Sequence, residues 1–454
     1  MDLITSAVVA AIEHGAPAHA PEAVLSHYRQ IQAAIGKFDS ASAILAAIAA
    51  LEADPADSRL RLALSTALAS ARVPDDMETL FAAQGLLDAL QRPSPQAPDV
   101  EALPATAPAP VDKGAVASNY AVVKVYFATD RQRDVGKPPA QRFSGERSFT
   151  AGHGADDGPL SYGSCDISIP RDHRMGQLES PSLWRLEWRA DPDKHVTLLS
   201  AEVQDHANFF AALKTQIRAS AGKSAFVFVH GYNVSFEDAA RRTGQMAYDL
   251  GFDGAPVFYS WPSRGDVAGY TTDENNIEWS TPHIAAFLAD FLARSEAAQV
   301  YLVGHSMGNR GLARAVAELM SADPQLAQRI TEIILTAPDI DAAIFKHDIA
   351  PKLARARNPV TLYASSQDLA LAASKAVHGY PRAGDSGAGM LIVAGVESID
   401  ASGVDTSFMK HSYFAEKRSA LSDMFYLIRN QARADQRFLD PVDTPAGRYW
   451  TFKA

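Results

Sequence analysis

The sequence predicts an α/β protein in which a mostly parallel sheet carries helices on both faces, preceded by a small all-helical domain. Three observations predict this fold class. Apolar residues recur at helical spacing within residues 1–92, a stretch rich in proline and alanine follows at 93–115, and strands alternate with helices from residue 116 onward. A chain of 454 residues is also long enough to form two or three folding units.

Residues 1–92 are rich in alanine and leucine, and their apolar residues gather on single helical faces. Val24, Tyr28 and Ile31 share one such face. Because a short amphipathic helix cannot bury its apolar stripe alone, these segments predict a small bundle. The segment holds no clustered histidines and no acid–base constellation. We therefore interpret it as an interaction or regulatory module that recruits a protein partner or self-associates.

The bundle is separated from the rest of the chain by the segment at 93–115. Six prolines lie between Pro93 and Pro110, interspersed with alanine, serine, glutamine and threonine. Such a composition favours an extended, semi-rigid spacer of roughly 3 Å per residue. We interpret this segment as the linker between two domains.

The first residues allow two interpretations. Leu3–Ile12 is apolar and Ala18–Ala20 resembles a signal-peptidase site, but Asp2 and Glu13 flank the apolar run where a secretory signal has a basic start. We expect a cytoplasmic protein, and export through an N-terminal signal is the alternative.

Composition excludes several classes of protein. The chain has 42 Lys and Arg against 53 Asp and Glu, a net charge of −11, which argues against a nucleic-acid partner. Cys165 is the single cysteine, so neither an intrachain disulfide nor a cysteine-based zinc site can form. No stretch approaches the roughly 20 apolar residues of a transmembrane segment.

Strands and helices alternate through the predicted catalytic domain at 116–435, as is typical of a mostly parallel sheet. Strands are predicted at 121–128, 162–169, 196–203, 225–229, 257–260, 300–303, 333–336, 360–364 and 390–396. Helices are predicted at 235–250, 284–294, from 309 and at 413–430, with a polar loop at 262–282. Residues 436–454 are interpreted as a C-terminal tail.

The strongest motif is Gly304-His305-Ser306-Met307-Gly308, which has the form G-x-S-x-G. It follows the predicted strand at 300–303 and precedes a helical segment, the context that a nucleophile elbow requires. The turn holds the serine backbone in a strained conformation, and the two glycines remove Cβ atoms that would clash. Ser306 is therefore the candidate nucleophile.

A serine nucleophile needs a base and an acid that orients the base. In this architecture the order along the chain is serine, acid, histidine. His411 follows the last predicted strand and is the candidate base, ahead of His347 and His378. Asp368, after the strand at 360–364, is the candidate acid. Asp339 and Asp341 follow the previous strand and remain alternatives, and helix capping is an alternative role for all three aspartates.

The remaining site residues are those of an oxyanion hole and a substrate wall. The backbone N–H of Met307 is one candidate donor, and that of Tyr232 in the loop His230–Asn233 is the other. His230 is expected to brace this loop. Tyr232, Trp261 and Tyr270 are candidate substrate-binding aromatics. The sequence has no Walker loop and no zinc-protease motif, and we expect neither a cofactor nor a metal.

Together these residues resemble the α/β-hydrolase superfamily and, more narrowly, the bacterial family catalogued as domain of unknown function nine hundred. The resemblance spans residues 119–430 and rests on these segments: Tyr126–Arg131, Tyr162–Cys165, Ile169–His173, Phe228–Asn233, Ser260–Ser263, Gly304–Arg310 and His411–Phe414. It implies an α/β-hydrolase fold and an esterase-like Ser-Asp-His hydrolase without an assigned substrate.

From these features we expect a serine carboxylester hydrolase that acts on a small-molecule ester through an acyl-enzyme intermediate. A thioesterase, amidase or lipase with the same triad is the first alternative, because triad residues do not specify the leaving group. The second is an effector or adaptor, whose helical domain recruits a partner and whose hydrolase domain is the output or an idle scaffold.

Overall fold

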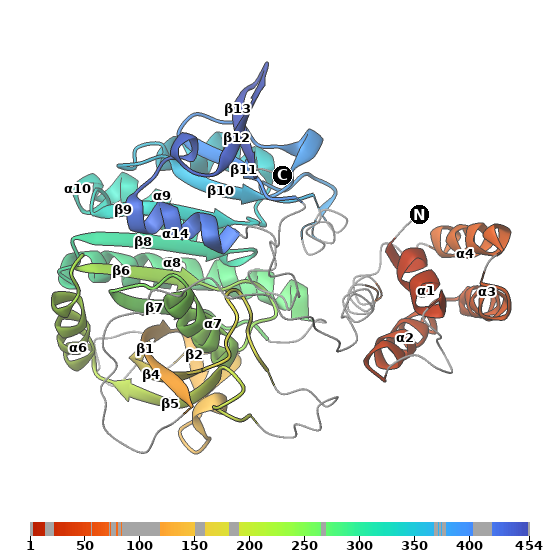
Figure 1. Ribbon diagram of the computed structural model, residues 1–454, viewed down its shortest axis with the longest axis horizontal. Helices are drawn as coiled ribbons and strands as arrows, with labels where there is room; N and C mark the ends of the chain where they lie inside the picture. The colour runs from red at the N-terminus through yellow and green to blue at the C-terminus, as the bar shows by residue number, and fades with distance from the viewer. Residues whose placement is uncertain are drawn as a thin grey trace. The chain divides into compact units, whose positions relative to one another are not determined.

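The computed structural model describes residues 3–13, 22–55, 57–71, 73, 79, 83, 119–149, 159–180, 190–264, 269–366, 371, 374, 378–402 and 420–452. The chain forms two compact units (Figure 1), the first built mostly from residues 1–104 and the second from residues 105–371 and 380–454. In this described part of the chain no helix is both long and apolar enough to span a membrane.

The first unit is helical, as its apolar spacing predicts. Its helices are α1 (Leu3–Glu13), α2 (Glu22–Ile35), α3 (Ala41–Ala53) and α4 (Ser58–Ser70). Each contributes fully buried side chains to one shared core, among them Val8, Ile31, Ile44 and Leu64. The apolar run that begins at Leu3 is therefore a core helix of this unit. Ala83, farther along the chain, is buried in the same core.

The second unit is built on one sheet of eleven strands, in the order β12-β13-β11-β10-β9-β8-β6-β7-β1-β4-β5 (Figure 1). The run from β13 to β1 is parallel, and β12, β4 and β5 pair antiparallel. The strands are β1 (Tyr120–Thr129), β4 (Ser161–Pro170), β5 (Thr197–Gln204), β6 (Ser224–Val229), β7 (Ala255–Ser260), β8 (Gln299–His305), β9 (Ile330–Thr336), β10 (Val360–Ala364), β11 (Val396–Asp400), β12 (Leu439–Thr444) and β13 (Gly447–Phe452). The predicted α/β fold class is confirmed.

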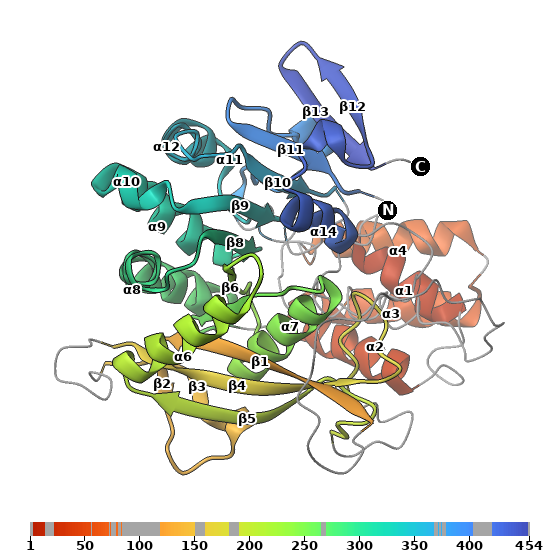
Figure 2. The ribbon, with the colours of Figure 1, turned by 60° about the vertical axis from the view of Figure 1, so that its left-hand side comes forward.

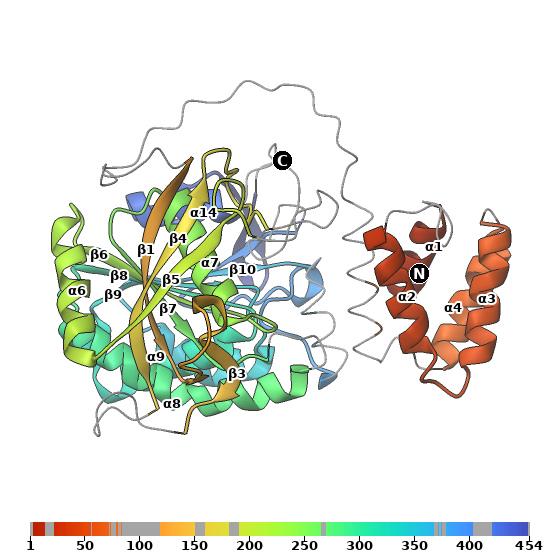
Figure 3. The same cartoon turned by 90° about the horizontal axis from the view of Figure 1, so that it is seen from below.

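Helices cover both faces of the sheet. Helices α8 and α9 run along one face and α7 and α14 along the other (Figures 2 and 3). On the second face Phe127 of β1 packs edge-on against Phe236 of α7, and the same core includes Leu427 of α14. The long helices are α6 (His206–Ala219), α7 (Phe236–Asp249), α8 (Tyr270–Arg294), α9 (Gly308–Ala322) and α14 (Ala420–Asn430).

Shorter elements complete this unit. A separate ribbon pairs β2 (Arg131–Arg133) with β3 (Phe143–Arg147). The short helices are η2 (Pro139–Gln141), α10 (Pro324–Ala327), α11 (Ala342–Ile344), η5 (Phe345–Ile349), α12 (Ala350–Leu353), η6 (Gly387–Gly389) and η7 (Ala434–Gln436).

Helix α8 differs from the expectation, because it begins at Tyr270 where the sequence indicates a polar loop through residue 282. Two polar residues of its first turns, Asp273 and Asn276, are buried by tertiary contacts. Asn276 donates to the Pro262 carbonyl at 2.6 Å, and Asp273 accepts from the Ser263 hydroxyl at 2.6 Å. Pro282 lies inside the helix and does not end it. Polarity and proline favour a loop in the isolated sequence, but tertiary packing overrides both.

Two further expectations fail near the C-terminus. The strand expected at 390–396 begins only at Val396, because Gly395 adopts a φ of +79° and turns the chain there. Residues 436–454, expected to be a tail, contain the hairpin β12–β13, and Trp450 of β13 is paired in register with Ile399 of β11. The hairpin therefore extends the central sheet.

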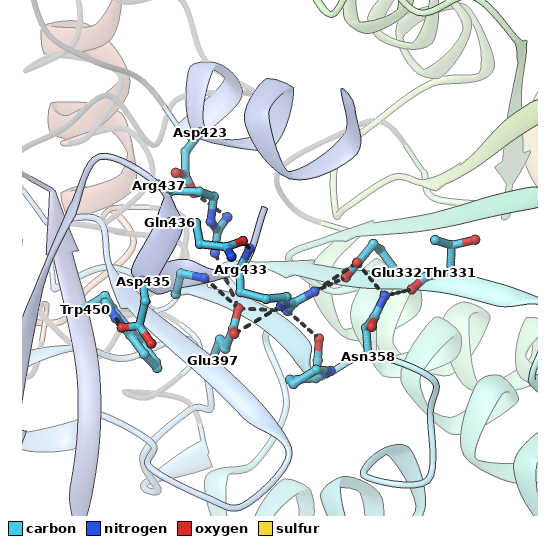
Figure 4. Close-up of polar contacts among 12 residues, drawn as sticks. Thr331, Glu332, Asn358, Glu397, Asp423, Arg433, Asp435, Gln436, Arg437 and Trp450 are labelled. Atoms are coloured by element: carbon cyan, nitrogen blue, oxygen red, sulfur yellow. Dashed lines mark hydrogen bonds and ion pairs between the residues drawn. The ribbon is translucent and has the colours of Figure 1, made fainter. Parts of the chain in front are cut away.

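Buried ion pairs hold the segment before this hairpin (Figure 4). Arg433 pairs with Glu332 of β9 at 2.9 Å and with Glu397 of β11 at 2.8 Å. Arg437, whose side chain is fully buried, pairs with Asp423 at 2.6 Å. Glu332 and Glu397 lie near the beginnings of their strands. This charge cluster therefore fastens the C-terminal residues to the amino edge of the sheet.

A buried imidazole makes the stability of the second unit depend on pH. His173 lies 2.8 Å from Glu179 and 2.7 Å from Asp249 at the end of α7. Burial alone would lower the pKa of His173, but hydrogen bonds and charge from Asp249 and Glu179 outweigh it and raise the pKa to about 9. Because the folded pKa exceeds the unfolded one, the stabilisation is complete below pH ~6.5 and is lost as pH rises through about 9.

We therefore expect the unfolding free energy to fall by about 3 kcal/mol between pH 6.5 and 10. Denaturant unfolding at a series of pH values measures this. His173→Gln should flatten the pH dependence and should be less stable than the wild type at pH 6.5. An equally steep pH dependence in the variant would show that another group is responsible.

Candidate active site

The candidate residues follow strands that end at one edge of the sheet. Val229 of β6 pairs with Gly304 of β8, and His305 pairs with Thr336 of β9. Farther along, Ala364 at the end of β10 pairs with Asp400 at the end of β11. The loops that follow these strands therefore start at the same carboxyl edge, where open parallel sheets bind their ligands.

Ser306 lies on a sharp turn between β8 and α9. Its φ of +48° is left-handed, and the residue is buried with 6% of its surface exposed. A Cβ on Gly308 would lie 2.1 Å from the His230 carbonyl oxygen, and one on Gly304 would lie 2.0 Å from Asn309 Oδ1. The predicted strand–turn–helix context, the strained serine and the need for both glycines are confirmed.

Two side chains that sequence reasoning missed hold this turn. The Ser306 N–H donates to the Thr336 carbonyl at 3.0 Å, and Asn309 Nδ2 donates to the same oxygen at 2.9 Å. The Thr336 hydroxyl in turn donates to the Gly304 carbonyl at 2.8 Å. The turn is therefore tied to the neighbouring strand β9 on both sides of the serine.

The strain at Ser306 predicts that a glycine stabilises the fold. A non-glycine residue in the left-handed region costs about 1 kcal/mol or more, so Ser306→Gly should raise the unfolding free energy by about 1 kcal/mol. Ser306→Ala is the matched control, since alanine keeps the Cβ and gives no such relief. Denaturant unfolding compares the two variants. A glycine variant no more stable than the alanine variant would show that the turn stores no strain.

The loop after β6 lies directly against the elbow. A Cβ on Gly231 would lie 2.6 Å from His305 Nδ1 and 3.0 Å from Ser306 Cβ, so only glycine allows this close approach. Tyr232 is half-buried, and Asn233 has a φ of +55°. On the other side of the serine, Met307 is buried at the N-terminus of α9.

His230 is a buried, neutral member of this loop. Its Nδ1 lies 2.8 Å from the Gly231 carbonyl, and its Nε2 lies 3.2 Å from the Ser260 hydroxyl. Its ring stacks on Trp261, whose indole N–H donates to the His230 carbonyl at 2.7 Å. Burial, and next the charge of Arg131, lower its pKa well below the ordinary value. These contacts fit a bracing role for His230.

The three candidate aromatics differ in exposure. Trp261 is fully buried beneath His230, so it supports the loop and presents no surface to a ligand. Tyr270 is also buried, and its ring meets that of Tyr232 edge-on at 5.2 Å. Tyr232 is the most exposed of the three.

Asp339 follows β9, and its carboxylate is hydrogen-bonded to three other side chains. Its carboxylate accepts from Arg382 at 2.7 Å, from Arg310 at 2.9 Å and from the Tyr270 hydroxyl at 3.0 Å. Burial alone would lower the pKa of Arg310, but Asp339, Tyr270 and Glu274 outweigh it and raise that pKa. Asp339 is therefore the centre of a buried ion network.

Asp341 is a helix cap, since its carboxylate accepts the backbone N–H groups of Ala343 and Ile344 at the start of α11. Capping was the alternative role considered for these aspartates, and it accounts for the contacts of Asp341.

Asp368 and His411 lie outside the described residues. The described residues that most closely precede them along the chain are Ser366 and Ser402, and these two residues meet. The Ser366 N–H donates to the Ser402 hydroxyl at 2.8 Å, and the Ala401 N–H donates to the Ala364 carbonyl at 2.8 Å. The segments that continue to Asp368 and His411 thus leave adjacent strands side by side.

The structure describes both competing histidines. His347 is exposed on η5, and His378 Nδ1 lies 2.7 Å from the Ser374 carbonyl. Within the residues that the structure describes, no group of three histidine, cysteine or acidic side chains could hold a metal ion.

Comparisons with known proteins match both units of the chain. Residues 205–430 match the model of a family described as alpha/beta hydrolase of unknown function (DUF900). Residues 1–127 match the model of the Het-E N-terminal domain. A comparison with curated proteins found no match.

Proposed function

Since residues 205–430 belong to the α/β-hydrolase family of unknown function, we propose that this chain is a serine hydrolase that cleaves carboxylic esters. One observation carries the proposal: Ser306 has a φ of +48° on the turn between β8 and α9. That conformation lifts a serine hydroxyl out of the carboxyl edge of a parallel sheet, where a substrate carbonyl can approach it.

In the proposed mechanism Ser306 attacks the ester carbonyl while His411 takes its proton. Asp368 orients the imidazole and stabilises the imidazolium that forms. The N–H groups of Met307 and Tyr232 stabilise the oxyanion of the tetrahedral intermediate. His411 then protonates the leaving alcohol and activates the water that releases the acyl group.

The contacts of Asp339 support the choice of Asp368 as the acid. The Asp339 carboxylate already accepts from Arg310, Arg382 and Tyr270, so an imidazole would have to share it with these three donors. In the sequence Asp368 is two residues beyond Ser366, and Ser366 contacts Ser402, which is nine residues before His411.

Hydrolysis of chromogenic acyl esters from acetyl to palmitoyl tests the proposal. We expect turnover by the wild type and a loss of about 10³-fold or more in Ser306→Ala. Turnover by Ser306→Ala at a rate close to that of the wild type would overturn the assignment of the nucleophile. Thioester and amide substrates in parallel would identify a different leaving group at the same site.

A second function, recruitment through the helical unit, is favoured by the match of residues 1–127 to the Het-E N-terminal domain. Because α1–α4 share a core of their own, this unit has the structure of an independent module. Size-exclusion chromatography of the full chain and of a variant lacking residues 1–115 tests self-association. Identical oligomeric states would remove self-association and leave recruitment of another protein.

A further inference from the structure

We propose that Arg131 is a positioning residue for the oxyanion loop, defined as His230–Val234, and that it sets the rate of the acyl-transfer step without contacting substrate. This inference rests on the proposed function. The loop must present the Tyr232 N–H at a fixed position, because a preorganised donor gains its effect only where the oxyanion forms.

The Arg131 side chain donates hydrogen bonds to both loops that flank the site. Its side chain is fully buried, yet Nη2 donates to the Val234 carbonyl of the oxyanion loop at 2.7 Å. Nε donates to the Ser260 hydroxyl at 2.8 Å and Nη1 to the Ser263 carbonyl at 2.9 Å. One guanidinium thus joins the end of the oxyanion loop to the segment that follows β7.

A buried carboxylate contacts the same two segments. Asp273 of α8 accepts from the Ser263 hydroxyl at 2.6 Å and from the Asn233 N–H at 3.5 Å. The Ser263 hydroxyl in turn accepts from the Val234 N–H at 3.2 Å. The N–H of Val234 therefore contacts Ser263, and its carbonyl contacts Arg131, which itself donates to Ser263.

The guanidinium also fixes the state of His230. Arg131 Nη2 lies 3.4 Å from His230 Nε2, which must then be the unprotonated nitrogen, while Nδ1–H donates to the Gly231 carbonyl. A positive charge beside Nε2 disfavours imidazolium. His230 is therefore kept as one neutral tautomer, with its ring stacked on Trp261.

Lysine cannot reproduce these contacts. Arginine presents five N–H donors in a rigid planar fork, whereas lysine presents three donors on one nitrogen. Arg131 uses donors that point toward Ser260, Ser263 and Val234 at once. An ammonium at this position keeps the charge but releases at least one of these anchors, so the oxyanion loop loses its fixed geometry.

The test compares Arg131→Lys and Arg131→Met with Arg437→Met in the full-length chain. Arg437 is the matched control, because it is also a fully buried, paired arginine but lies in the charge cluster at the amino edge (Figure 4). Both methionine variants should lose stability. With kcat measured per folded molecule well below the melting temperature, only the Arg131 variants should lose about 10²-fold in kcat with KM nearly unchanged.

A second readout separates positioning from general loosening. A boronic acid that forms a tetrahedral adduct with Ser306 should bind the Arg131 variants more weakly by the same factor as the loss in kcat/KM. Arg437→Met should bind it as the wild type does. If Arg131→Met does not fold, Arg131→Lys alone decides the comparison.

Two results would overturn the inference while the proposed function stands. One is an equal loss of kcat in Arg131→Lys and Arg437→Met. The other is an unchanged boronic-acid affinity in Arg131→Lys. A wild type that hydrolyses no acyl ester in a Ser306-dependent way would instead overturn the proposed function, and this inference with it.

Discussion

Replacing Ser306 by alanine is expected to lower kcat by about 10³- to 10⁶-fold, because the variant lacks the group that forms the acyl enzyme. His411→Ala should cost a similar factor, since a serine without its base stays protonated at neutral pH. Because the two residues act as a unit, the double variant should lose no more than either single variant. Steady-state hydrolysis of the best acyl ester measures all three.

The structure provides controls for this result. Ser306→Gly should be inactive yet more stable, which would separate catalysis from folding at one position. His347→Ala changes an exposed histidine on η5 and should retain full turnover. A His411→Ala variant that remains active while His378→Ala does not would move the base to His378.

The features that the sequence could predict are those encoded by short-range patterns. Strand β8, the elbow at Ser306 and helix α9 follow one another within 24 residues, and each has a local signature. The order of the loops along the chain then follows from the parallel sheet, in which every loop after a strand starts at the same edge.

The sequence could not predict contacts between residues that are far apart in the chain. Arg131 contacts Ser263 across 132 positions, and Asp339 contacts Arg382 across 43. No local pattern marks either pair. The start of α8 was missed for the same reason, because Asp273 and Asn276 look solvent-exposed until their partners are known.

Two substitutions can identify the catalytic acid, because one should lower kcat and the other should lower the unfolding free energy. Asp368→Asn should lower kcat by about 10⁴-fold, because the imidazole loses the carboxylate that sets its tautomer and stabilises its charge. Asp339→Asn should lower kcat far less, because that carboxylate is committed to Arg310 and Arg382. Removing its charge should instead cost about 3 kcal/mol of unfolding free energy, since the buried Arg382 loses its counter-ion and Arg310 keeps only Glu274.

Asp341→Asn is the control for both variants, because asparagine caps a helix as well as aspartate does and should change neither quantity. Hydrolysis and denaturant unfolding of the three variants form the complete experiment. A large loss of kcat in Asp339→Asn with unchanged stability would place the acid after β9. The arginines around Asp339 would then have to release it when substrate binds. The expected pattern, with activity lost at Asp368 and stability lost at Asp339, follows because the Asp339 carboxylate pairs with Arg310 and Arg382 in the folded protein.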